Sequence, residues 1–265
     1  MSVNVFRQEF RLNRRGFLIW TAMIMAVLVL YLSFFPYIQS PEYSELLEGF
    51  PAALKDAFNI HQIVFEEINY YHALQVLPYL LLLTSIYAAM LAGRLISREA
   101  DLNTAEFLFT RPVTRNRILA AKVTVFLLMM VLLWMLLYMA ALVLAAAVDP
   151  GAFNTTRQLW VHLAGLLATL AAGGIAFAAA PLINQVSAAT TLGVALGFGF
   201  FLVDALSKTT EKLHFLRYFT VYYYAGFEDA AAGKPFYPGM LFLLLVFLLG
   251  TALGFLLLHR KEYTG

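Results

Sequence analysis

The sequence predicts an all-α integral membrane protein with six transmembrane helices. Hydrophobic residues fill 62% of its 265 positions and the mean hydropathy is +0.75, whereas soluble domains are roughly 45 to 50% apolar. Several apolar runs are long enough to cross a hydrocarbon layer of ~30 Å as helices. Basic residues gather in the segments expected on one side of the membrane. We therefore expect a single transmembrane domain, residues 1–265, in the cell membrane with both termini in the cytoplasm.

Composition excludes several kinds of chemistry. Only 13% of residues are charged and the net charge is +2, which is too small to indicate a nucleic-acid partner. The chain has no cysteine, so disulfides, thiolate catalysis and sulfur-ligated metals are excluded.

The N-terminal segment, residues 3–15, combines apolar side chains at helical spacing with arginines on a neighbouring face. Such a helix can lie in the plane of the membrane interface, with its arginines among anionic headgroups. A simple topology signal is the alternative. The apolar run at 17–38 is longer than the ~7 to 15 residues of a signal-peptide core. We expect it to be retained as the first span.

An outer loop, residues 39–72, follows the first span and is rich in acidic residues. Two short helices are expected in it, the first opening at Ser40-Pro41 and stopping at Gly49, the second starting at Pro51. Neither is long enough to span, so both should rest on the outer leaflet or cap the mouth of a pathway. The second span is expected at 73–95, with a kink at Pro78 because proline lacks a backbone donor.

The remaining spans are expected at 117–148, 159–180, 188–206 and 238–258. Alanine and glycine dominate the span at 159–180, and small side chains let helices approach closely, so this helix should be buried in the bundle. The last two spans each contain one Gly-x-x-x-Gly pair, Gly193 with Gly197 and Gly250 with Gly254. Each pair is a weak dimerisation motif, and chance occurrence is the alternative.

An outer segment, residues 207–237, connects the last two spans and carries many aromatic residues, Phe215 to Phe227. Amphipathic aromatic rings favour the headgroup level of a membrane. An interfacial anchor is therefore one interpretation of this segment.

A polar loop, residues 96–116, separates the second and third spans and should face the cytosol, because positive charge gathers around it. Ser97 can cap a short helix that Glu99 and Asp101 favour and that Pro112 ends. Thr114 is a suitable N-cap for the next span. The basic residues in and around the loop are Arg94, Arg98, Arg111, Arg115, Arg117 and Lys122.

The order of residues in this loop resembles the first cytoplasmic loop of the type 2 ABC-transporter permeases. The matching stretches are Ile96-Ser97-Arg98-Glu99, Thr104-Ala105-Glu106-Phe107-Leu108, Arg111-Pro112-Val113-Thr114-Arg115, Ile118-Leu119 and Ala121-Lys122. Asn103 stands where the family commonly has glycine. The resemblance implies the type 2 ABC exporter fold, with an N-terminal in-plane elbow helix at 3–15 and a coupling helix in this loop.

The resemblance also implies partners. The coupling helix would dock onto a separate ABC ATPase subunit, with a second permease copy completing the assembly as a homodimer or a heterodimer. The aromatic segment at 207–237 would dip into the outer leaflet and help close an external gate. ATP and magnesium would bind the partner ATPase, with no cofactor on this chain. The expected ATPase-coupling residues are Glu99, Leu102, Glu106, Phe107, Leu108, Arg111 and Arg115.

Sequence motifs of catalysis are missing. No P-loop, His-Glu-x-x-His or Gly-x-Ser-x-Gly occurs, and the five histidines are scattered along the chain. Asp204 lies near the outer end of its span and is expected to reach water, which gives little support to an ion relay. We therefore expect a chain that is not an enzyme and that is driven by another subunit.

Spans one, two and five offer Phe, Leu, Met and Tyr with few polar groups, which suits amphipathic or lipid-like cargo. The expected function is export of amphipathic peptides or other hydrophobic cargo, similar to the exporters of phenol-soluble modulins. Permeases for antibiotic or sodium efflux share the loop pattern and remain alternatives. A membrane sensor coupled to an ATPase and a self-sufficient channel are alternatives from other classes.

Overall fold

The computed structural model describes residues 3–58, 60, 67–101, 115–183 and 185–260. Within these ranges the regular structure is helical, and six helices are long and apolar enough to cross a membrane. The predicted all-α class with six spans is therefore confirmed. The spans are α1 (Val3–Ile38), α5 with η1 and α6 (Ile68–Tyr71, His72–Val76, Leu77–Asp101), α8 (Arg115–Val148), α9 (Thr155–Ala179), α10 (Val186–Thr209) and α13 (Tyr237–Arg260).

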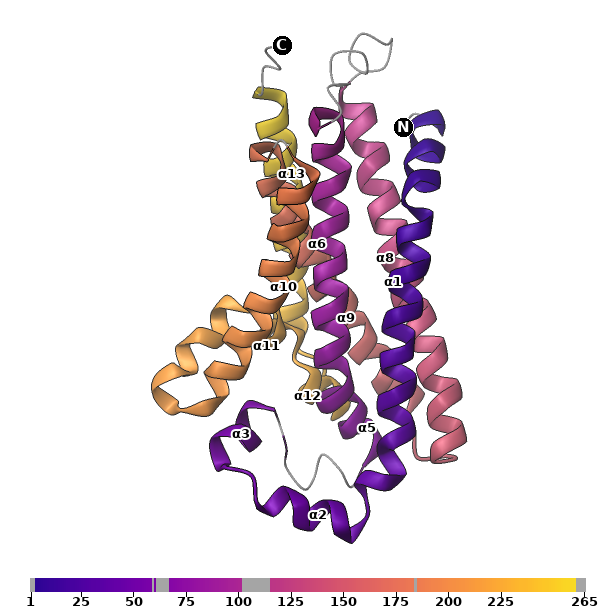
Figure 1. Cartoon of the computed structure of the whole chain (residues 1–265), viewed down its shortest axis with the longest axis vertical. Coiled ribbons are helices and arrows are strands. Elements are labelled where there is room, and N and C mark those ends of the chain that lie inside the picture. The colour runs from indigo at the N-terminus through magenta and orange to yellow at the C-terminus, as the bar shows by residue number, and fades with distance from the viewer. Residues whose placement is uncertain (1–2, 59, 61–66, 102–114, 184, 261–265) are drawn as a thin grey trace.

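Two central helices, α6 and α9, hold the bundle together. In the most apolar part of each, 72% and 67% of residues are buried, against 17 to 33% in the other four spans. Helix α6 packs against α10 and α9, and α9 packs against α13, while α1 packs mainly on α8 (Figure 1). The burial predicted for the alanine- and glycine-rich fourth span is confirmed.

The N-terminal segment differs from the expectation. Residues 3–15 do not form a helix of their own, because α1 runs without interruption from Val3 to Ile38. Glu9 and Asn13 are buried, and Glu9 pairs with Lys122 of α8. This buried contact holds the first turns of α1 against the bundle, so they continue the helix that follows.

A π-helical turn, η1, lies at the start of the second span. It ends at Val76, two residues before Pro78, which has no N–H to donate to the carbonyl one helical turn earlier. A π-turn widens the helix and, like proline, is a recognised cause of bending. Tyr222 of α11 (Val221–Ala225) donates its hydroxyl proton to the Pro78 carbonyl at 3.1 Å. The irregular turn is thus joined to the outer segment.

The Gly193 and Gly197 pair in α10 faces α6 within the same chain. A Cβ added at Gly193 would lie 2.7 Å from the backbone nitrogen of Met90, and one at Gly197 would collide with the side chain of Ile86. Small residues here allow α10 and α6 to pack with their backbones close together. This contact is intramolecular, which corrects the interpretation as a subunit interface.

The second pair, in α13, has the same role against α9. A Cβ at Gly250 would collide with the carbonyl of Gly174, and one at Gly254 with the carbonyl of Phe177. Backbone atoms cannot move aside as a flexible side chain can. Both glycine pairs therefore build contacts inside one chain.

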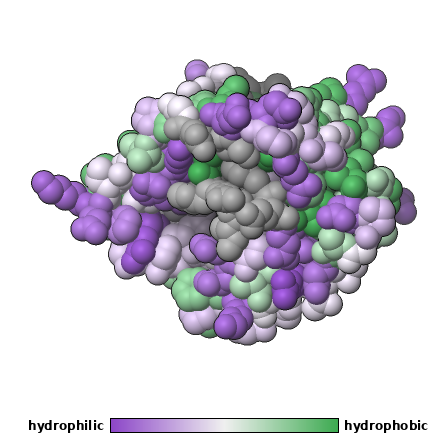
Figure 2. Space-filling model, turned by 90° about the horizontal axis from the view of Figure 1, so that it is seen from below, coloured by the Kyte–Doolittle hydropathy of each residue, from purple (hydrophilic) through white to green (hydrophobic). Residues whose placement is uncertain are grey.

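The outer loop contains α2 (Pro41–Glu48) and α3 (Ala52–Ala57), which start at or next to the two prolines. The Ser40 hydroxyl accepts from the Tyr43 amide at 3.3 Å and caps α2. Helix α3 packs on α10, and the Phe58 carbonyl accepts from Gln75 Nε2 of η1 at 2.8 Å. Helices α2 and α3 thus lie at this end of the molecule, where Figure 2 shows many hydrophilic residues.

The segment after α10 leaves the bundle as η3 (Glu211–Phe219) and returns as α11 and α12 (Phe227–Ala231), which pack on α9 (Figure 1). Its aromatic side chains separate into two groups. Phe215, Tyr218 and Phe219 are exposed, whereas Tyr222 and Phe227 are buried. The first group suits an interfacial anchor, and the second belongs to the core.

Candidate functional site

The predicted ATPase-coupling residues lie at and between the ends of α6 and α8. Glu99 falls in the last turns of α6, and Arg115 is the first residue of α8. The others fall outside the described residues, namely Leu102, Glu106, Phe107, Leu108 and Arg111.

Ser97 does not start a new helix, which corrects the sequence interpretation. Helix α6 continues through it to Asp101, and its side chain is buried. The Ser97 hydroxyl donates to the carbonyl of Ala180 in η2 (Ala180–Leu182) at 3.4 Å. The end of α6 is therefore bonded to the end of α9 just before the loop begins.

A buried charge joins three helices beside this loop. Lys122 Nζ of α8 lies 3.0 Å from Glu9 Oε1 of α1, and the two side chains are 3% and 7% exposed. The same ammonium donates to the Leu95 carbonyl near the end of α6. Asn13 Nδ2, one turn along α1, donates to the Glu9 carbonyl at 2.9 Å. We call Glu9, Lys122 and the Leu95 carbonyl the three-helix junction.

The sequence did not reveal this junction. Glu9 and Lys122 lie more than a hundred residues apart along the chain, so no local pattern links them. One sequence feature could have pointed to a buried partner: Lys122 is the eighth residue of α8 and lies among apolar residues. The structure shows that its neighbours Leu119 and Ala121 are buried. A lysine among buried neighbours requires a partner.

Helices α1, α6 and α10 lie side by side on one face of the bundle, with α6 in the middle (Figure 1). An aromatic row crosses this face towards the outer end. Tyr79 of α6 has its ring centre 5.1 Å from Tyr31 of α1 and 5.8 Å from Phe201 of α10, and Phe201 lies 6.2 Å from Tyr222. These spacings are those of favourable aromatic pairs. The row links all three helices and the outer segment.

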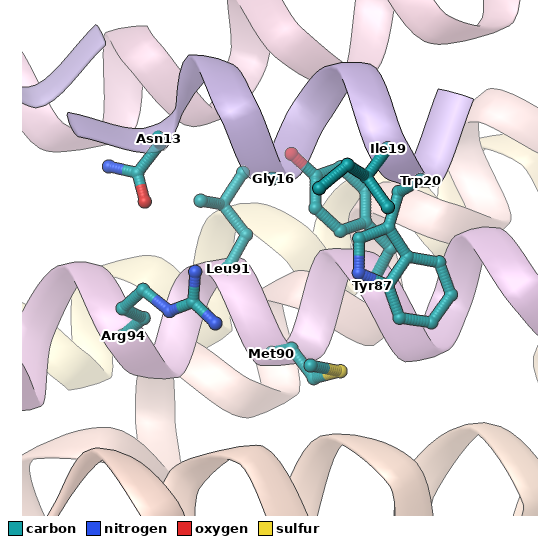
Figure 3. Close-up of a pocket in the computed structure, with 8 residues that line it drawn as sticks. All are labelled: Asn13, Gly16, Ile19, Trp20, Tyr87, Met90, Leu91 and Arg94. Carbon is teal, nitrogen blue, oxygen red and sulfur yellow. The ribbon is translucent and has the colours of Figure 1, made fainter. Parts of the chain in front are cut away.

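Nearer the loop, a pocket of about 110 Å³ opens between α1 and α6 (Figure 3). Its walls are mostly apolar, and Trp20 stacks on Tyr87 with ring centres 5.6 Å apart. Its polar side chains are Asn13 and Arg94, with Gly16 beside the guanidinium, and the stacked pair adds the Trp20 indole N–H and the Tyr87 hydroxyl. The lining residues are Asn13, Gly16, Ile19, Trp20, Tyr87, Met90, Leu91 and Arg94.

The outer quarter of the bundle encloses a polar cluster that sequence reasoning missed. The rings of His72 and His162 stack with centres 5.1 Å apart. Gln158 Oε1 lies 2.8 Å from His72 Nδ1, and its carbonyl lies 2.8 Å from His162 Nδ1. Asn69 Oδ1 accepts from the Asn154 amide at 2.9 Å and from Gln158 Nε2 at 3.3 Å. Histidines ninety residues apart give no local motif. The cluster joins η1 to α9.

The side chain of Asp204 is buried, whereas the sequence predicted that it reaches water. Lys208 Nζ lies 2.6 Å from its Oδ2. Both line an outer pocket of about 320 Å³ that also includes Arg217. The Arg217 guanidinium donates to the Tyr218 hydroxyl at 2.9 Å, and this hydrogen bond raises the pKa of Arg217. Its carbon also lies 5.1 Å from the centre of the Tyr223 ring.

These groups offer binding surfaces and no arrangement for covalent catalysis. Among the described residues, no three His, Asp or Glu side chains gather as a metal site would need. The described part of the site instead consists of α6 and α8, which the three-helix junction holds together and joins to α1, and of the aromatic row on α1, α6 and α10.

Comparisons with known proteins agree with the loop resemblance. No curated protein matches the chain. A family model described as ABC-2 family transporter protein matches residues 3–263, and this confirms the predicted likeness to type 2 ABC-transporter permeases. The match makes the chain a multi-pass membrane component of an ABC transporter and does not distinguish one cargo from another. The chain belongs to the ABC-2 transporter family.

Proposed function

We propose that this chain is the permease subunit of an ATP-driven exporter of amphipathic peptides or other hydrophobic cargo. A separate ABC ATPase would bind the loop between α6 and α8, hydrolyse ATP with magnesium and thereby move these helices. A second permease copy, identical or related, would complete the pathway in the cell membrane, with both termini in the cytoplasm.

The three-helix junction is the observation that carries the proposal. A force applied to Glu99, Arg115 or the residues between them reaches α6 and α8 directly, because the loop joins their ends. Lys122 passes the movement of α8 to α1 through Glu9 and to α6 through the Leu95 carbonyl. A buried charge pair resists separation, since each charge alone would be costly. All three helices are expected to respond together.

The face formed by α1, α6 and α10 supports hydrophobic cargo. The two helices that flank α6 carry exposed apolar side chains, among them Leu30 and Phe34 on α1 and Phe198 and Leu202 on α10. The aromatic row closes its outer part. Such a surface suits a helix or acyl chain better than a sugar or a bare ion.

Reconstitution with a candidate partner ABC ATPase tests the proposal. Proteoliposomes holding both proteins should accumulate an amphipathic helical peptide only when ATP is hydrolysed. A labelled antibiotic and sodium ions serve as alternative cargoes in the same vesicles. Peptide-stimulated ATP hydrolysis without movement of cargo would indicate a sensor, and ion conductance from the permease alone would indicate a channel.

Crosslinking tests the partner contact separately. Because the chain has no cysteine, Glu106→Cys provides a unique thiol in the loop, and Asp149→Cys provides one near the other end of α8. A short bifunctional maleimide should join Glu106→Cys to the ATPase and leave Asp149→Cys unjoined. Failure to capture an ATPase from any loop position would overturn the proposal.

A further inference from the structure

We propose that the pocket between α1 and α6 binds the phosphate headgroup of a membrane lipid from the cytoplasmic leaflet. The inference rests on the orientation given in the proposed function. Its chemistry is a phosphate anion next to a hydrogen-bond donor, as in phosphatidylglycerol. The lipid tails would lie outside the pocket, along α1.

Among the described residues, two polar side chains of the pocket have unused bonding capacity. Arg94 is half-buried, and no described residue forms an ion pair or hydrogen bond with it. Its guanidinium fork matches phosphate oxygens in geometry and charge. Asn13 is 3% exposed, and its Oδ1 is buried without a hydrogen-bond partner. An anion at Arg94 that also carries a hydroxyl group would satisfy both.

The size of the pocket selects part of a ligand. About 110 Å³ is well below the roughly 300 to 1,000 Å³ of pockets that enclose a whole drug-sized ligand. Figure 3 shows Arg94 and Asn13 at one end, with Ile19, Trp20 and Met90 towards the other. Ile19 is 69% exposed, so the apolar end continues onto the outer surface of α1. A headgroup inside and a tail outside fit this division.

The surroundings favour a negatively charged lipid. Arg94 lies two turns before the end of α6, at the edge of the apolar run. Arg11, Arg14 and Arg15 are exposed on the facing part of α1. Arginines at this depth attract anionic headgroups. The Glu9 carboxylate nearby is paired with Lys122 and does not line the pocket.

Native mass spectrometry of the full chain in detergent tests the site without ATP or an ATPase. The chain is titrated with dioleoyl phosphatidylglycerol, with dioleoyl phosphatidylcholine and with inorganic phosphate. Phosphatidylglycerol should bind best, and Arg94→Gln should weaken it at least about tenfold, because a charged hydrogen bond is lost. Arg15 is exposed, so Arg15→Gln removes the same charge where solvent screens it and should change binding about twofold or less.

A second pair of variants tests the space. A Cβ at Gly16 would lie 3.7 Å from Arg94 Nη1, an ordinary contact, so Gly16→Ala should bind the lipid normally. Gly16→Leu fills the pocket with Arg94 intact and should abolish binding. Thermal unfolding of each variant confirms that it is folded.

Equal losses in Arg94→Gln and Arg15→Gln would overturn the inference, as would normal binding by Gly16→Leu. Equal binding of the two lipids, or tight binding of inorganic phosphate alone, would also contradict it. Because no measurement here depends on transport, failure of the export proposal would leave the result readable.

Discussion

At the scale of single residues, polar side chains inside the bundle serve as joints between helices. Lys122 contacts two other helices through one ammonium group, and Gln158 uses its side chain and its carbonyl to fix two histidines. Desolvation makes an unpaired buried charge or amide costly. The loss of stability on replacing such a side chain therefore depends on whether its former partners stay buried without a hydrogen bond or counter-ion.

The Glu9 and Lys122 pair gives a prediction about stability. Lys122→Met leaves the Glu9 carboxylate buried without its counter-ion and should lower the free energy of unfolding by about 3 to 5 kcal/mol. The double variant Glu9→Gln with Lys122→Met has no buried charge and should recover much of this loss. Thermal or denaturant unfolding in detergent measures both. The single variant Glu9→Gln completes the comparison. If the double variant loses as much stability as Lys122→Met and Glu9→Gln lose together, this account is contradicted.

Gln158→Leu tests the histidine cluster. The variant removes the partner of His72 Nδ1 and one donor to Asn69 Oδ1, which should cost about 1 to 3 kcal/mol of folding free energy. Gln185→Leu is the control, because Gln185 is exposed and its replacement should change stability little. Equal unfolding temperatures for the two variants would show that the cluster contributes nothing.

At the scale of helices, two pairs of neighbours meet through glycines. Helix α10 packs on α6 at Gly193 and Gly197, and α13 packs on α9 at Gly250 and Gly254. In a lipid environment, close approach of backbones replaces the hydrophobic drive that acts in water. The two pairs then join through α6 and α9, which are also the most buried spans.

Two identical substitutions in α10 should have opposite effects. Gly193→Ala would place its Cβ 2.7 Å from the backbone nitrogen of Met90 and should destabilise the chain by about 1 to 3 kcal/mol. A Cβ at Gly199 meets nothing within 4 Å, so Gly199→Ala should be neutral or stabilising by up to about 1 kcal/mol. Unfolding temperatures in one detergent compare them. If both variants are destabilised alike, the backbone contact is not the cause.

At the scale of the whole molecule, the junction and the polar cluster lie near opposite ends of the bundle. The proposed orientation places α2, α3 and η3 outside the cell and the ends of α1 and α13 inside. Single cysteines in the cysteine-free chain test this directly.

A membrane-impermeant maleimide applied to intact cells should label Glu45→Cys in α2 and Lys212→Cys in η3. It should label Arg7→Cys and Arg260→Cys only after the membrane is made permeable. All four residues are exposed, so access is decided by the membrane alone. Labelling of Arg260→Cys in intact cells would place the C-terminus outside and reverse the orientation.

Sequence alone predicted the class, the six spans and the burial of the fourth, because apolar length and residue size act locally. It also predicted the start of α2 at Pro41. It missed the pairing of Glu9 with Lys122 and of His72 with His162, since both depend on how distant helices pack. The predicted division of α1 at residue 16 was wrong, because the buried contact that holds the arginine-rich turns depends on a distant helix.

The close packing of α10 on α6 limits how far the two helices can move independently of each other. At Gly193 and Gly197 the main chain of α10 lies against the main chain of α6, so little room is left for one helix to slide past the other. Helix α6 follows η1, which carries His72 of the polar cluster, and ends at the predicted coupling loop, while α10 is followed by η3. We therefore expect an axial movement of α6, as the proposed coupling would produce, to carry α10 and the start of η3 with it.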